Sequence, residues 1–301
     1  MSRNRILEYK SISDSVINLT NRVGQKIIES AKRMKIKRSK QTNINYVEGC
    51  FKMNVNDYLK GGNTLTVEYI MYFFNSQDSY NVFLKNDDEN VNSEADPDTN
   101  TIKIVSAFIN NDVTNDFYET ISHELEHLYQ YGKGMEKRQE LYDKVKRLLE
   151  YRGNNIDAYY VGLTCYYSFK HEQDAFVHQF YTRLKQNGKR GKFEECIREY
   201  QPYQTINKAY DILLTYQDNQ RIMKAINYLG FTRKKFLNLL YYRLKRFDKK
   251  LYNAYDRYMK ETRELTEGRI NWLIKMMGEW IEDSERLGYD IEWGLESIYK
   301  F

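Results

Sequence analysis

The chain has 301 residues, of which 41% are hydrophobic, 30% charged and 15% aromatic, a composition that excludes a disordered or collagen-like chain. Its 15 Gly and 2 Pro favour long helices over a turn-rich sandwich or propeller. The net charge is +5, and no stretch reaches the ~20 uncharged apolar residues of a membrane span. Three widely spaced cysteines form neither a disulfide framework nor a CxxC metal site. With a charged start and no signal-peptide pattern, we expect a cytoplasmic protein.

The first third of the chain predicts one helix followed by three strands. Residues 10–34 are amphipathic, because their apolar residues recur at steps of three and four. Residues 44–54, 64–74 and 101–109 are rich in β-branched and aromatic side chains, which favour strands. Between the last two strands, the acidic, Asn-rich residues 85–100 predict a long mobile loop.

From about residue 114 the pattern becomes helical. Helices are predicted over 115–131, 135–151 and 155–185, and several more follow to the end of the chain. The fold class is therefore α+β, with an N-terminal helix and a small, mostly antiparallel sheet before an all-helical half. The expected division of the chain is 1–132, 133–190 and 191–301.

The sequence H-E-L-E-H at 123–127 carries the strongest chemical signal. On a helix, residues four apart share one face, so His123 and His127 can offer imidazole nitrogens to one metal ion. Glu124 is rotated about 100° from His123, and it can act as a general base toward a water on that metal without being a ligand. Thr114 or Asn115 is expected to cap this helix at its start.

A zinc site needs a third protein ligand, and the two other histidines, His171 and His178, lie in one later helical segment. In that segment Glu172 projects near the edge of the apolar face, whereas His171, Asp174 and His178 project to the far side. A carboxylate near an apolar face is costly to bury unless it is paired or metal-bound. Glu172 is therefore the favoured third ligand, and His178 or His171 is the second choice.

These motifs, H-E-L-E-H-L-Y-Q at 123–130 and E-Q-D-A-F at 172–176, resemble the zincin metallopeptidases of the gluzincin type. Gln130 matches small bacterial and phage members that have H-E-L-x-H-x-x-Q. The resemblance covers residues 10–185 by layout and implies a zincin-like fold that binds Zn²⁺. It implies that His123, His127 and Glu172 are ligands and that Glu124 is the base.

One position departs from the gluzincin pattern. Many members have Asp four residues after the ligand Glu, but this chain has Phe176, and Asp174 is nearer. A downstream His that would stabilise the transition state is also missing, so His178, Tyr166, Tyr167 and Tyr181 are the candidates for that role. Asp174, His171 and His178 are kept as alternative ligands or as groups that orient the ligands.

The expected function is zinc-dependent hydrolysis of a peptide or protein substrate, whose backbone would add to the edge of the 101–109 strand. One alternative is an inactive zincin scaffold with a structural or interaction role, such as a phage virion component. The Lys-, Asn- and Ile-rich composition indicates an AT-rich genome of a phage or low-GC bacterium. A second alternative is a zincin-like domain fused to a nucleic-acid-binding regulator. It rests on basic stripes at 1–40 and 232–264, which carry 11 Lys/Arg against 3 and 4 Asp/Glu.

Overall fold

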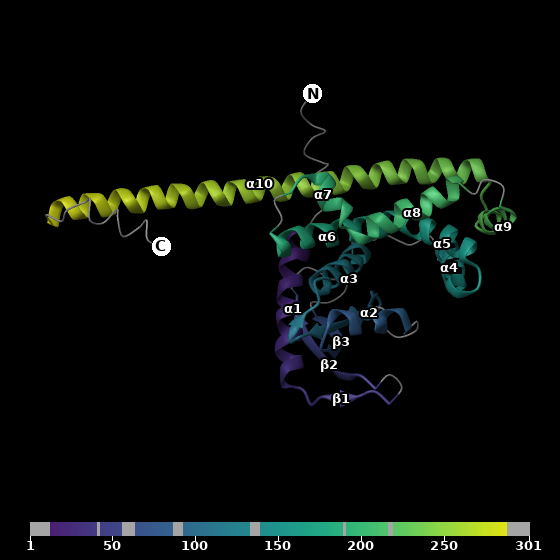
Figure 1. The fold of residues 1–301 in the computed structure, drawn as a ribbon, viewed down its shortest axis with the longest axis horizontal. Coiled ribbons are helices and arrows are strands. Elements are labelled where there is room, and N and C mark those ends of the chain that lie inside the picture. Colours follow the sequence, from purple (N-terminus) through teal and green to yellow (C-terminus); the bar gives the residue numbers. More distant parts are fainter. Residues whose placement is uncertain are drawn as a thin grey trace, which may run out of the picture. The chain divides into compact units, whose positions relative to one another are not determined.

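A computed structural model describes residues 13–40, 43–55, 64–86, 93–132, 139–188, 191–215 and 219–287. The architecture is α+β (Figure 1). The chain divides between Tyr255 and Asp256 into two compact units. The finer division expected at 132 and 190 stays a prediction. The elements are α1 (Asp14–Arg33), β1 (Lys37–Arg38), β2 (Asn45–Asn54), β3 (Thr64–Phe74), α2 (Gln77–Asn86), β4 (Glu94–Asp96), β5 (Thr101–Ile109), β6 (Asp112–Val113), α3 (Phe117–Gly132), α4 (Gln139–Leu149), α5 (Ile156–Ser168), α6 (Lys170–Asn187), α7 (Phe193–Arg198), α8 (Gln201–Thr215), α9 (Gln220–Tyr228) and α10 (Arg233–Leu287).

The sheet has the strand order β1-β2-β3-β5-β4, and β6 also pairs with β5. β3 and β5 run parallel from Thr66 and Thr101 to Phe74 and Ile109, and the other neighbouring strands are antiparallel. The sheet is therefore mixed, because the pair of β3 and β5 is parallel and the other pairs are antiparallel. The parallel arrangement follows from α2, which lies between β3 and β5 in the chain and supplies the long connection that parallel strands need.

The prediction that 101–109 forms an open edge strand is wrong. β5 has β3 on one side, and β4 and β6 pair with the two ends of its other side. Between them, the Val105 amide donates a 3.0 Å hydrogen bond to the Ser93 hydroxyl. The loop expected over 85–100 is also corrected, because α2 extends through Asn86 and β4 occupies Glu94–Asp96; residues 87–92 lie outside the described part. β4 is the outer strand at this end of the sheet.

The two faces of the sheet have separate cores. On β3, Leu65, Val67 and Met71 alternate with the strand period and pack with α1 and α3 on one face. Tyr72 and Phe74 belong to the other face, where residues of α2 join them. The alternation explains why this strand was readily predicted, and it fixes α3 against the sheet.

The helical part has its own core, formed by α4, α5, α8, α9 and the start of α10. The helix predicted over 155–185 is in fact two helices, because Phe169 adopts an extended backbone with φ −63° and ψ 141°. The break redirects the chain so that α6 packs along α3. The predicted helices over 10–34 and 115–131 are confirmed as α1 and α3, within the described residues.

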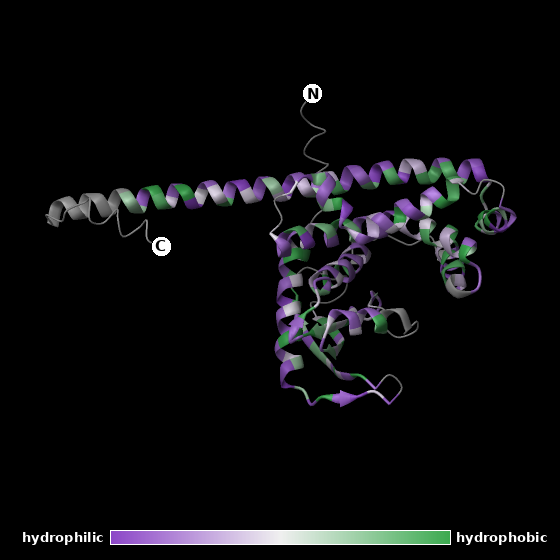
Figure 2. Cartoon of the chain, in the orientation of Figure 1, coloured by the Kyte–Doolittle hydropathy of each residue, from purple (hydrophilic) through white to green (hydrophobic). Residues whose placement is uncertain are grey.

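Hydrophilic residues interrupt the hydrophobic ones along the helices (Figure 2). Among the described residues, no helix combines the length and the apolar character needed to cross a membrane.

Candidate metal centre

The two histidines of the H-E-x-x-H motif lie on α3, and apolar residues of the same helix anchor it in the core. Phe117, Ile121 and Leu125 are fully buried in the core that α3 shares with the sheet and α1. His123 and His127 therefore project toward α6, and their side chains are 12% and 14% exposed. The helix that positions the ligands is thus held by its apolar residues.

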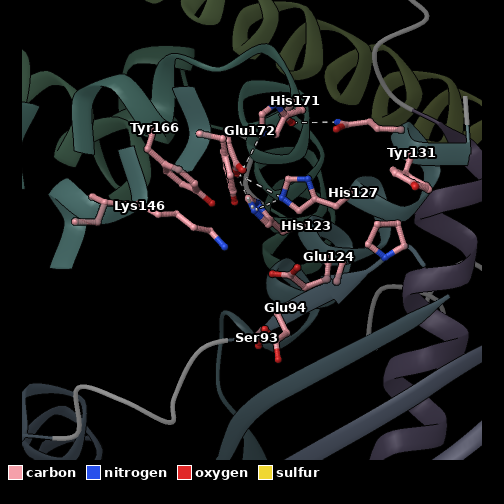
Figure 3. A pocket seen from close by; sticks show the side chains of 15 residues that line it. Ser93, Glu94, His123, Glu124, His127, Tyr131, Lys146, Tyr166, His171 and Glu172 are labelled. Carbon is pink, nitrogen blue, oxygen red and sulfur yellow. Dashed lines mark hydrogen bonds and ion pairs between the residues drawn. The ribbon is translucent and has the colours of Figure 1, made fainter. Parts of the chain in front are cut away.

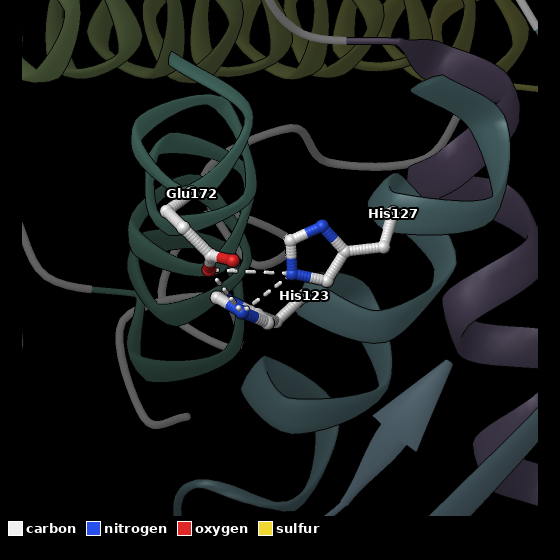
Figure 4. Close-up of side chains that lie close together, drawn as sticks. All are labelled: His123, His127 and Glu172. Atoms are coloured by element: carbon white, nitrogen blue, oxygen red, sulfur yellow. Dashed lines mark hydrogen bonds and ion pairs between the residues drawn. The ribbon is translucent and has the colours of Figure 1, made fainter. Parts of the chain in front are cut away.

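α6 supplies the third donor from its first turn. Glu172 is only 1% exposed, and it follows the break at Phe169 by three residues. A carboxylate in the first turn of a helix is favoured by the helix dipole. Glu172 was predicted ahead of the neighbouring histidines because a buried carboxylate needs a partner. In the structure its Oε2 atom faces the imidazoles of His123 and His127 (Figure 4).

The three donor atoms form a compact triangle. The Nε2 atoms of His123 and His127 are 3.1 Å apart, and they lie 3.6 and 3.4 Å from Oε2 of Glu172. In a tetrahedral zinc site with bonds near 2.0–2.1 Å, two ligand atoms are separated by about 3.3 Å. The triangle therefore has the size of one face of such a tetrahedron, and these residues fit a zinc ion.

The electrostatics of Glu172 also fit a cation. Burial alone would raise the pKa of its carboxyl group, but the nearby imidazoles of His127, His123 and His171 hold that pKa well below its usual range. Oε2 of Glu172 is buried without a hydrogen-bond partner, and so are the Nδ1 atoms of His123 and His127. A buried carboxylate of this kind is stable only beside positive charge.

Two of the alternative ligands, His171 and Asp174, lie in different surroundings. His171 is close to the centre: its Nε2 is 3.3 Å from Oε1 of Glu172, and its ring stacks on Phe169. Asp174 forms an ion pair with Lys250 instead. Asp174 therefore does not take the place of the orienting Asp of the gluzincin pattern.

His178 has a structural role in the described part of the chain. It was expected on the far side of α6, but it is 1% exposed, and the correction follows from what surrounds it. Its Nε2 accepts a 2.8 Å hydrogen bond from the Ser13 amide and lies 3.3 Å from Glu126, and its Nδ1 is 3.0 Å from the Asp174 carbonyl. These contacts tie the start of α1 and α3 to α6.

Gln130 connects the two ligand-bearing helices. Its side-chain amide donates to Glu126 at 3.0 Å and to the carbonyl of His171 at 3.1 Å. The second bond crosses from α3 to the residue just before Glu172. Gln130 therefore sets the position of Glu172 relative to the histidines.

Of the tyrosine candidates, Tyr166 is the one that lines the pocket beside the centre. Burial raises the pKa of its phenol well above the usual range, so the hydroxyl keeps its proton. Tyr167 packs on Phe176, which packs on His123. Tyr181 is fully buried and lines no part of this pocket.

The donors open onto a pocket of about 500 Å³ (Figure 3). Glu124, which is 8% exposed, lies on its wall beside the histidines. Glu94 of β4 and the preceding Ser93 also line it, and α4 contributes Tyr142 and Lys146.

Ser93, Glu94, Tyr142 and Lys146 were not predicted as part of the site. Tyr142 and Lys146 are four residues apart, so they share one face of a helix. Only the tertiary packing shows that this face lies beside the H-E-x-x-H motif.

Comparisons with protein-family models, with curated proteins and with solved structures find no match for this chain.

Proposed function

We propose that this protein is a zinc-dependent metallopeptidase. The observation that carries the proposal is the triangle of His123, His127 and Glu172, with donor atoms 3.1 to 3.6 Å apart, beside Glu124 on the wall of an open pocket. The gluzincin resemblance of the two motifs points to the same residues and the same roles.

The number of donors favours a catalytic site over a structural one. Structural zinc sites have four protein ligands, whereas catalytic sites have three and leave one position for water or substrate. Among the described residues, the group of mutually close donors contains His123, His127 and Glu172 without a fourth member. This supports an enzyme over the alternative of an inactive scaffold with a closed metal site.

A bound zinc ion would polarise the scissile carbonyl and lower the pKa of a coordinated water. Glu124 takes the proton from the attacking water and passes it to the nitrogen of the leaving amine. The protonated hydroxyl of Tyr166 would donate a hydrogen bond to the oxygen of the carbonyl under attack. Glu124 and Tyr166 both line the pocket next to the histidines.

A peptide substrate would pair with β4 rather than with β5. β4 is the outer strand of the sheet, and Ser93, Glu94 and Ala95 line the pocket. An extended peptide can add to such an edge through main-chain hydrogen bonds. This replaces the substrate edge expected at 101–109.

Metal content of the purified protein tests the site directly. We expect about one zinc per chain, and loss of that zinc in His123→Ala and in Glu172→Ala. Glu140→Ala is the control, because this carboxylate is exposed and its ion pair is with Lys144 on the same helix. A wild-type protein that stays zinc-free after zinc is supplied would contradict the proposal.

Turnover tests the role of Glu124. Glu124→Gln is expected to keep its zinc and to lose about 10²- to 10⁴-fold in kcat on a peptide substrate, as is typical when a general base is removed. Peptide cleavage at the wild-type rate by this variant would show that Glu124 is not the base.

A further inference from the structure

Apart from its histidines, the charged side chains that line the pocket beside the candidate centre are acidic, with one exception. Glu94, Glu124 and Glu172 line it, and Lys146 is the single Lys or Arg among its described lining residues. His123, His127 and Glu172 are assigned to the metal, and Glu124 to proton transfer. Lys146 therefore has no role in the proposed chemistry, and its charge is opposite to that of Glu94 on the pocket wall.

Lys146 is held over the pocket by an aromatic side chain. Its Nζ lies 5.0 Å from the ring centroid of Tyr142, one turn earlier on α4, and the ring of Tyr142 is 5.8 Å from that of His171. Figure 3 shows Lys146 extending from α4 into the open space, with its amino group toward His123 and Glu124. A cation on a tyrosine face keeps its charge available to a further partner.

Lys144, the neighbouring lysine on α4, differs from Lys146 because it has an acidic partner. Lys144 forms a 2.8 Å ion pair with Glu140, whereas no described carboxylate forms an ion pair with Lys146. Glu94, on the opposite wall, is itself close to Lys103, at 3.8 Å. The acidic wall thus has a partial counter-charge of its own, and Lys146 is directed at the space that a substrate would fill.

We propose that Lys146 makes the enzyme selective for substrates that carry a carboxylate next to the scissile bond. This inference rests on the proposed peptidase function and names its substrate class. An anionic group entering the pocket meets Glu94 and Glu124, so the ammonium of Lys146 is the group that offsets this repulsion. The carboxylate belongs either to an acidic side chain or to the C-terminus of a short peptide.

The test is a charge reversal with a matched control. Three otherwise identical peptides with amidated ends carry Glu, Gln or Lys at each position flanking the scissile bond, and a fourth carries a free C-terminus. They are offered to the wild type, Lys146→Glu and Arg147→Glu. Arg147 is the control because it is the next residue, is also exposed, and lines a separate cavity.

We expect the wild type to prefer the carboxylate-bearing peptide over the Lys peptide by roughly tenfold in kcat/KM at low salt. Lys146→Glu should reverse this preference, and Arg147→Glu should retain it. Preference for the Glu peptide assigns the carboxylate to a side chain, and preference for the free C-terminus assigns it to the chain end. An unchanged preference in Lys146→Glu, or a wild type that prefers Lys, overturns the inference.

Two further readouts separate this inference from the proposed function. The Gln peptide should be cleaved equally by the wild type and by Arg147→Glu, and failure of both to cleave it would count against the peptidase itself. Binding of the same peptides to Glu124→Gln, measured by fluorescence anisotropy, should show the carboxylate preference without turnover. The double variant Glu124→Gln with Lys146→Glu should lose that preference. Persistence of the preference in the double variant would overturn the role of Lys146.

Discussion

Glu119 is a buried carboxylate near the start of α3 whose ionisation opposes folding. It is 2% exposed and lies 3.3 Å from Arg183. Burial raises the pKa of its carboxyl group to about 7, although the charge of Arg183 lowers it in part. The folded protein thus binds a proton that the unfolded chain releases near its ordinary pKa of 4.5. Stability from this group is present below pH 4.5 and is lost as the pH rises through about 7.

Glu119→Gln should therefore gain stability relative to the wild type as the pH rises. The expected gain between pH 5 and 8 is about 2–3 kcal/mol in the free energy of unfolding, since one pKa unit corresponds to about 1.4 kcal/mol. Urea unfolding at several pH values measures it. Glu140→Gln, at an exposed position, should show no such rise, and parallel pH profiles for Glu119→Gln and the wild type would contradict the assignment.

At the scale of single residues, the sequence predicted which donor residues lie together better than it predicted their surroundings. His123, Glu124 and His127 follow from helical spacing, which is a local property. Glu172 followed from the cost of burying a carboxylate, and the structure brings it to the two histidines. His178 was misplaced because its burial depends on the start of α1, 165 residues away along the chain. Spacing within one helix carries no information about such a contact.

Gly162 lets α4 and α5 approach closely. A Cβ at this position would lie 2.7 Å from Leu148 Cβ and 3.3 Å from the backbone of Leu148 and Leu149. Backbone atoms cannot be moved by a change of rotamer, so Gly162→Ala should force α4 away. We expect a net loss of about 1–3 kcal/mol by overpacking, against a gain of at most about 1 kcal/mol in helix propensity. Chemical denaturation measures the difference.

Gly268→Ala, in α10, is the matched control for Gly162→Ala. It is a helical glycine at which an added Cβ would meet nothing within 4 Å, so the substitution should only raise helix propensity. A neutral or stabilising Gly162→Ala would show that α4 is not held at this distance. Because α4 carries Lys146, weaker packing there should also reduce the substrate preference proposed above.

At the scale of elements, β2, β3 and β5 were predicted within one residue of their observed ends, because their side chains are strongly β-forming. α2 and β4 were not predicted. β4 is three residues long, acidic and stabilised by pairing with β5, so its strand character comes from its neighbour. The break at Phe169 was missed for a similar reason, since the apolar pattern runs on from α5 into α6 without interruption.

At the scale of the whole molecule, the division between Tyr255 and Asp256 falls inside α10. The residues of the candidate centre all belong to the first unit. So do Lys250, which pairs with Asp174, and Arg243, whose carbonyl accepts from Gln173 at 3.0 Å. The first part of α10 thus holds α6 in place, and α6 holds Glu172. The sequence predicted helices throughout this region, but periodicity alone does not reveal a boundary within one continuous helix.

A chain that ends after Thr262 should therefore keep the metal centre. It retains Lys250 and Arg243 and about two helical turns beyond the boundary, which protects these contacts from fraying at the new helix end. We expect an unchanged zinc content and an unchanged kcat/KM on a Gln peptide. A chain that ends after Leu240 is the contrasting variant, because it loses both contacts to α6, and it should lose zinc affinity. Loss of zinc from the longer chain as well would show that the site depends on residues after the boundary.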